Sequence, residues 1–192
     1  MYTNKVLVYL FIQKTKQKMD NQKSSSTQVM LNYGLILGVI SVLTAVANFA
    51  FGNVYKPHWS ISVVSAVLSI VVIVLGLKAI KQNNGGFLSL GESLKNGLGI
   101  ALISGIIYVI YFYLFVNFIE PEYFSNLAKV QEATMIEMYP NFTDEQLESA
   151  MEMSKKMSGF GMISAIALIM SLFFGFIISL IGGLILKRTE ED

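Results

Sequence analysis

The sequence predicts an all-α membrane protein in which four transmembrane helices form a bundle and an amphipathic helical hairpin joins the third span to the fourth. Of the 192 residues, 54% are hydrophobic and only 14% are charged, which is too few charges to cover a water-facing surface. The apolar residues are also gathered into four blocks of roughly 20, nearly free of charge, the length that a helix needs to cross a bilayer. This distribution excludes a soluble enzyme and a nucleic-acid-binding protein.

Each block carries further features of a membrane helix. The second has Trp59 at one interface and Lys78 at the other, where the lysine can extend to the headgroups. The third has most of its aromatic residues in its C-terminal half, as an interfacial belt would. The fourth is long enough to require tilt. The predicted spans are residues 31–51, 59–80, 98–118 and 162–186.

Residues 1–27 are predicted to lie outside the membrane domain, which covers residues 28–187 and is followed by a polar tail, residues 188–192. They are mostly polar, and their apolar run, residues 6–12, is too short to span a bilayer and lacks the cleavage site of a signal peptide. We therefore expect a disordered or spurious extension, with the natural start at Met19.

The basic residues predict the orientation in the membrane. Few basic residues lie on the predicted outer side of the bilayer, and the long connection there, residues 119–160, also holds eight acidic residues. By the positive-inside rule, both termini and the connection between spans two and three are cytoplasmic, and the acidic loop faces outward. Ten of the fourteen basic residues lie on the predicted inner side: Lys5, Lys14, Lys16, Lys18, Lys23, Lys78, Lys81, Lys95, Lys187 and Arg188.

Small residues spaced by four predict how the spans pack. Lipid is as apolar as leucine, so membrane helices associate where small side chains let their backbones approach closely. Such rows suit packing inside one bundle, and the alternative is a seam between two copies of the chain. The predicted packing residues are Gly34, Gly38, Gly97, Ala101, Gly105, Ser171, Gly175, Ser179 and Gly183.

The outward loop is predicted to form two amphipathic helices. A break at Tyr139-Pro140-Asn141 separates them, and Thr143 with Gln146 forms a capping box at the start of the second. The second helix either ends before the fourth span or continues into it. The apolar faces of the two helices are rich in methionine, which suits adaptable surfaces. The two helices pack on each other and lie on the membrane, or they dock an envelope protein. A methionine-based metal site is the weakest alternative. The candidate lipid or partner surface comprises Phe124, Leu127, Met135, Met138, Leu147, Met151 and Met157.

The spans carry no chemistry that the sequence can identify. No ionisable residue lies within their apolar parts, which argues against proton relays and charge-coupled carriers. The chain has no cysteine and a single histidine, so the sequence predicts no catalytic residue, no cofactor site and no metal site. A lipid-modifying enzyme would have to use His58, Glu92 or Glu120, and the predicted topology places these on different membrane faces.

Three short motifs resemble one bacterial family. Asn32-Tyr33-Gly34-Leu35 opens the first span, Gly86-Phe87-Leu88-Ser89-Leu90-Gly91-Glu92 precedes the third, and Pro121-Glu122-Tyr123 follows it. From Gln28 to Lys187 the chain is similar to four-span proteins catalogued as domain of unknown function 4199, found mainly in Bacteroidota-type bacteria. The resemblance implies an inner-membrane protein with a Met19-like start and no assigned activity.

These observations predict a non-enzymatic protein of the bacterial inner membrane with a structural or accessory role. Its partners would be the lipid bilayer and an envelope protein or a second copy of the chain, and no nucleic acid. The alternative is a small oligomeric transporter or channel for an uncharged or lipid-like substrate, lined by the serines and asparagines of the bundle.

Overall fold

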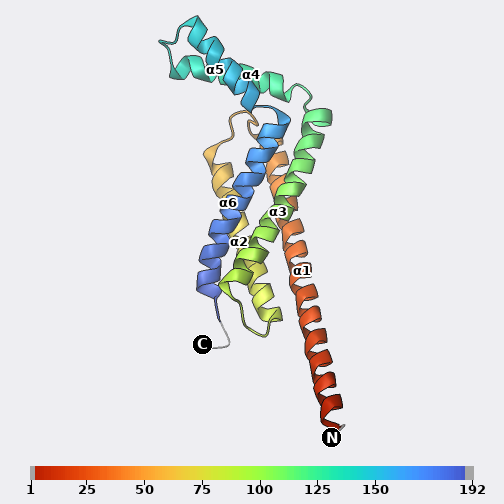
Figure 1. Cartoon of the computed structure of the whole chain (residues 1–192). Coiled ribbons are helices and arrows are strands. Elements are labelled where there is room, and N and C mark those ends of the chain that lie inside the picture. The colour runs from red at the N-terminus through yellow and green to blue at the C-terminus, as the bar shows by residue number, and fades with distance from the viewer. Residues whose placement is uncertain (1–2, 189–192) are drawn as a thin grey trace.

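The computed structural model describes the backbone of residues 3–188 and the side chains from Ser26 onward. In this part of the chain, four long apolar helices run side by side and two shorter helices lie across one end of them (Figure 1). We call this end of the bundle the hairpin end, and the opposite end the terminus end. The predicted fold class, four membrane-span-like helices in a bundle with a helical hairpin between the third and fourth, is confirmed.

The helices begin and end where local signals place them. The helix that carries the predicted third span begins at Leu90, because Ser89 caps it: Glu92 N–H donates to the Ser89 hydroxyl, and the Glu92 carboxylate accepts from Ser89 N–H. The elements are α1 (Thr3–Phe51), α2 (Trp59–Asn83), α3 (Leu90–Leu114), the π-helical turn η1 (Phe115–Ile119), α4 (Tyr123–Met138), α5 (Asp144–Met157) and α6 (Phe160–Leu186).

The backbone before the first span continues α1. We expected residues 1–27 to be a disordered or spurious extension, whereas the structure has α1 begin at Thr3. No glycine or proline occurs before Gly34, so nothing in the sequence interrupts the helix there. The start at Met19 stays a prediction, and residues 1–2 and most of the predicted tail, residues 189–192, lie outside the described part.

The order of the helices around the bundle differs from their order along the chain. Helix α3 packs mainly on α1 and α6, and α2 also packs on α1 and α6. Consecutive helices α2 and α3 therefore face each other across the bundle, and the short segment between them crosses the terminus end. Helices α1 and α3 run in the same direction, as do α2 and α6. Each helix therefore has one parallel and one antiparallel neighbour.

Glycines bring α1 close to α3. A methyl group built on Gly34 would lie 2.7 Å from Cβ of Ile103, and one on Gly38 would overlap the side chain of Ile107. Isoleucines of α3 fill the space beside both glycines, so the predicted row on α1 makes room for branched side chains of α3. One turn beyond, the hydroxyls of Ser41 on α1 and Ser104 on α3 lie 3.4 Å apart.

Small residues on both helices bring α3 close to α6. A methyl group on Gly97 would overlap the Ser179 hydroxyl, and one on Gly175 would overlap Cβ of Ala101. The Ser171 hydroxyl donates to the Ala101 carbonyl at 2.9 Å, which adds an interhelical hydrogen bond. The other two predicted packing residues are also at this contact, Gly105 against Leu168 and Ser171, and Gly183 against Ser93.

Helix α2 joins the core only in its second half. Its buried residues all lie from Val72 onward, whereas Val63, Val64 and Val67 are exposed and free to face lipid. Gly76, which is not among the predicted packing residues, makes room for the side chains of Ile100 and Tyr33. The tight core therefore lies toward the terminus end, and its buried members are Leu37, Val72, Ile73, Leu77, Ile80, Leu88 and Ile100.

Candidate functional site

The α4–α5 hairpin projects beyond the bundle at the hairpin end (Figure 1). Pro140 interrupts the helical pattern, and Phe142 N–H donates to the Tyr139 carbonyl at 3.1 Å, so the chain reverses in a few residues. The predicted capping box then starts α5: Gln146 N–H donates to the Thr143 hydroxyl, and Thr143 N–H donates to the Gln146 side chain. The hairpin is thus defined by local sequence.

A polar cluster and half-buried apolar side chains hold α4 against α5. The Ser154 hydroxyl donates to Oε1 of Gln131 at 2.7 Å, and Nε2 of Gln131 lies 3.3 Å from the Ser158 hydroxyl. Neither helix has a buried residue. Because the hairpin has no core of its own, its stability depends on these hydrogen bonds and on what covers its faces.

Aromatic rings anchor the base of the hairpin to the bundle. The ring of Phe112 on α3 makes edge contacts with Tyr123 and Phe124 at the start of α4, with centroids 5.7 and 6.3 Å apart. It also stacks on Phe160, the first residue of α6, at 5.7 Å. Both ends of the hairpin are therefore fixed to one buried ring, and edge-to-face pairs of this kind add to the apolar burial.

A second tie joins the α1–α2 loop to the same base. The Tyr55 hydroxyl donates to Oε1 of Glu120 at 3.0 Å, Nδ2 of Asn126 donates to the Tyr55 oxygen at 3.3 Å, and the Tyr55 ring stacks on Tyr123. Burial raises the pKa of Tyr55 above its ordinary 10.0, the hydrogen bond from Asn126 lowers it, and the bond to Glu120 with that residue's charge raises it. The net direction is upward, so the phenol stays protonated in the folded protein at neutral pH.

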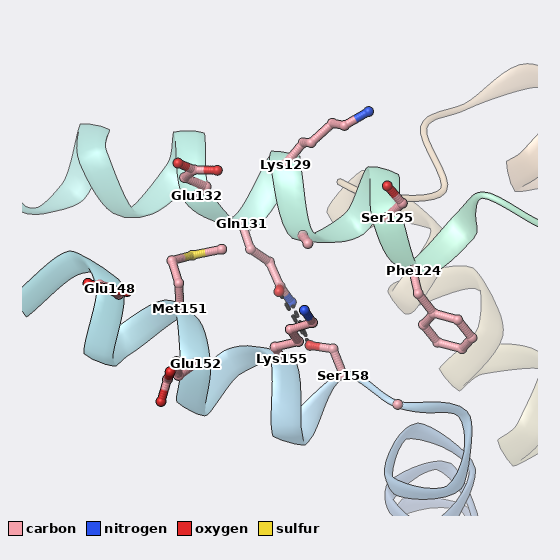
Figure 2. A pocket seen from close by; sticks show the side chains of 12 residues that line it. Phe124, Ser125, Lys129, Gln131, Glu132, Glu148, Met151, Glu152, Lys155 and Ser158 are labelled. Atoms are coloured by element: carbon pink, nitrogen blue, oxygen red, sulfur yellow. Dashed lines mark hydrogen bonds between the residues drawn. The ribbon is translucent and has the colours of Figure 1, made fainter.

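A groove of about 670 Å³ runs between α4 and α5 near their base (Figure 2). Figure 2 shows the side chains of Met151 and Gln131 pointing into the space between the two helices. Glu132, Glu148 and Glu152 line the part of the groove toward the turn, Lys129 and Lys155 lie near its middle, and Phe124, Ser125 and Ser158 line the part toward the bundle. Such a groove, with its acidic residues on the turn side of its lysines, suits an amphipathic helix of reversed charge order.

The predicted partner surface is divided by the fold. Phe124 packs on the aromatic cluster of the bundle, and Met138 and Met157 are exposed. The remaining four are half-buried: Leu127, Met135, Leu147 and Met151. The exposed apolar side chains that the predicted surface left out are Ile136, Tyr139, Phe142 and Met153. Helical periodicity marks an apolar face but does not say which part of it the neighbouring helix covers, so no sequence signal separates the two groups.

The three residues that an enzyme would need do not meet. Glu92 lies at the terminus end, in the cap of α3, and Glu120 lies at the hairpin end beside Tyr55. His58 caps α2, where Ser60 N–H donates to its Nδ1 at 3.3 Å. Within the described residues, no group of three or more histidine, aspartate or glutamate side chains is placed to hold a metal ion.

A family model described as "Protein of unknown function (DUF4199)" matches residues 32–188. No curated protein and no solved structure matches the chain. The matched region contains most of the first span, the other three spans, the hairpin and the three motifs that carry the resemblance, so the resemblance is confirmed.

Proposed function

Because the chain belongs to the DUF4199 family, whose function is unknown, we propose from its architecture that it is a non-enzymatic membrane protein with a structural or accessory role, whose α4–α5 hairpin contacts a protein partner. One observation carries this proposal. The hairpin lies outside the spans and has large apolar side chains exposed at its surface, among them Met138 at 65% and Met153 at 66% exposure. Exposed apolar patches outside a bilayer are typical of interaction sites.

The bundle has the properties of a rigid support for this hairpin. Leu88 is fully buried at the terminus end. Its backbone, in the segment between α2 and α3, forms hydrogen bonds with Arg188, just after the end of α6. At the hairpin end, Phe112 and Tyr55 fix the base of α4 in two places. A recognition element on a fixed base loses less entropy on binding than a free one, which supports a scaffold role.

The orientation that we propose is that of the bacterial inner membrane, with both termini cytoplasmic and the hairpin outside. The described basic residues at the terminus end support it: Lys78, Lys81, Lys95, Lys187 and Arg188. The chain has no cysteine, so single cysteines can report the topology. Ser149→Cys should react with a membrane-impermeant maleimide in intact cells, and Gly91→Cys should react only after lysis.

Gly91 suits the inner reporter, because a side chain at this position meets open space and the capping residue Ser89 stays unchanged. The reverse labelling pattern would put the hairpin in the cytoplasm. The proposed partner would then be a cytoplasmic protein.

The function is tested by removing the hairpin alone. Replacing residues 122–157 with a glycine-serine linker should leave the protein in the membrane fraction and abolish photo-crosslinking to its partner. Crosslinking is measured from a photoreactive residue at Lys56, an exposed residue next to Tyr55 in the loop beside the hairpin base. The matched control, Ile169→Ala, changes an exposed residue of α6 and should crosslink as the wild type does. Unchanged crosslinking of the deletion would reject the hairpin as the contact.

A second function, transport of an uncharged or lipid-like substrate, is favoured by two buried polar atoms. Asn48 Oδ1 and Ser164 Oγ are buried and make no hydrogen bond with the protein. Each could contact a substrate within the bundle, since a buried polar group without a partner is costly. Purified protein in vesicles should then pass glycerol or urea faster than empty vesicles do, and Asn48→Ala should reduce the rate. Equal rates with and without protein would reject this function for these solutes.

A further inference from the structure

The charged residues of the hairpin are segregated along its length. Between Tyr123 and Met157, every acidic residue lies nearer the turn than every lysine, and all of these side chains are exposed. Within the described chain, none of them forms an ion pair. The two further acidic residues of this region, Glu120 and Glu122, precede α4, and Glu120 bonds to Tyr55. The acidic half holds Glu132, Glu137, Asp144, Glu145, Glu148 and Glu152, and the basic half holds Lys129, Lys155 and Lys156.

The membrane restricts how two copies of this hairpin can meet. The four spans fix the direction of the chain in the bilayer, and the hairpin lies across the end of the bundle rather than along its axis (Figure 1). Two copies in the same membrane that form a closed dimer are related by a twofold axis along the membrane normal. Such an axis reverses the direction of any element that lies across it, so the two hairpins meet antiparallel.

Antiparallel hairpins bring opposite charges together, six acidic residues of one copy against three lysines of the other. The acidic half of each copy then lies beside the basic half of the other, and the symmetry makes every such contact twice. Parallel hairpins would instead place acid beside acid. The exposed apolar side chains Ile136, Met153 and Met157 lie on the same two helices. Along the groove the order of charges is the same, with Glu148 nearer the turn than Lys155.

We propose that the groove and the exposed faces of α4 and α5 form a homodimer interface, in which a second copy of the chain docks its own hairpin antiparallel, with Glu145 and Glu148 of each copy facing Lys155 and Lys156 of the other. The proposal rests on the proposed function, in that it takes the hairpin as the contact surface, and it names the partner. Methionine side chains adapt to the irregular surface of a second α5, and the charged residues set its direction.

A charge exchange tests the pairing. One full-length variant carries Lys155→Glu and Lys156→Glu, and the other carries Glu145→Lys and Glu148→Lys. Each is reconstituted in lipid vesicles, and association is measured by energy transfer between donor- and acceptor-labelled copies. The wild type should associate, and either variant alone should associate about tenfold more weakly, because surface ion pairs contribute a few tenths to one kcal/mol each. An equimolar mixture of the two variants should recover wild-type association.

Recovery in the mixture also shows that both variants are folded. The control Lys56→Glu changes an exposed lysine at the same end of the bundle outside the hairpin, and should associate as the wild type does. Association of the wild type should weaken as salt increases, since ions screen exposed pairs. A monomeric wild type, or a mixture no better than its components, would overturn the proposal.

A second measurement separates failure of this inference from failure of the proposed function. A photoreactive residue replaces Met153, which is 66% exposed on α5, and the full chain is irradiated in cells. A product with the mass of two chains supports the dimer. A product with another protein and none of dimer mass overturns the dimer while leaving the hairpin as a contact surface. No protein product at all rejects both.

Discussion

Leu88 and Arg188 are bonded to each other in both directions, although 100 positions separate them in the numbering of the chain: Leu88 N–H donates to the Arg188 carbonyl at 3.0 Å, and Arg188 N–H donates to the Leu88 carbonyl at 3.1 Å. The Leu88 side chain is fully buried in the core cluster, and the Arg188 guanidinium lies 6.0 Å from the ring centre of Phe87. The segment between α2 and α3 therefore closes the terminus end and holds the end of α6.

Leu88→Ala should destabilise the bundle. The side chain is 0% exposed, so its loss leaves a cavity that costs about 2–5 kcal/mol of unfolding free energy. The measurement is the midpoint of thermal unfolding in detergent. Leu184→Ala, at a side chain that is 60% exposed, is the matched control and should shift the midpoint little. Equal shifts would show that Leu88 does not close the core.

Gly97→Ala should destabilise the contact between α3 and α6, because the new methyl group overlaps the Ser179 hydroxyl. Overpacking of this kind costs about 1–3 kcal/mol. Adding Ser179→Gly removes the obstructing side chain and should recover part of the loss, which a double-mutant cycle of unfolding free energies measures. Gly91→Ala on the same helix meets open space and should be neutral or stabilising. An additive cycle would contradict the contact.

Lys81→Met should loosen the end of α6. The Lys81 ammonium donates to the carbonyl of Leu186, the last residue of α6, at 2.7 Å, and a cation at that position also favours the helix dipole. Loss of a charge-assisted bond costs about 1.5 kcal/mol or more. Hydrogen exchange of the last turn of α6 should accelerate. Lys78→Met, an exposed lysine on the same helix, should leave it unchanged.

The tie between Tyr55 and the hairpin base should open at alkaline pH. The pKa of Tyr55 is raised in the folded protein, and burial also raises that of Tyr123, so the folded state favours the protonated phenols. Their contribution to stability is therefore full below the ordinary pKa of 10.0 and is lost as pH rises through the higher folded pKa. The wild type should unfold at a higher temperature than Tyr55→Phe at neutral pH, and this difference should shrink above about pH 10. Tyr139→Phe, at an exposed tyrosine, should show no such trend.

Trp59 should report the membrane interface at the hairpin end. It is the single tryptophan of the chain, is 70% exposed and begins α2. In vesicles, lipids brominated near the headgroup should quench its fluorescence more than lipids brominated at the chain ends, since indole rings favour the interface. Moving the tryptophan two turns deeper, with Trp59→Phe and Val67→Trp, should reverse this order. Stronger quenching of Trp59 by the lipids brominated at the chain ends would place the start of α2 outside the interface.

Local signals predicted most of the secondary structure. Span positions depend on stretches of apolar residues, and helix ends depend on caps such as Ser89 and Thr143, whose partners lie three residues away. One question that the pattern left open was the junction of α5 and α6, where Ser158 and Gly159 end one helix and start the next. Gly159 has no side chain to favour either helix, so periodicity could not place the break.

The sequence by itself determined a helical protein with four helices long and apolar enough to span a membrane and an outlying helical hairpin, because apolar length, periodicity and capping are properties of neighbouring residues. Only the tertiary structure decided that α2 faces α3 across the bundle, that Leu88 closes the terminus end, and which methionines of the hairpin stay exposed. Small residues at a spacing of four recur on several spans, and apolar contact has no direction, so the sequence leaves several pairings nearly equal. The choice among them depends on side chains distant in sequence, such as Gly97 and Ser179, that fit only when two helices meet.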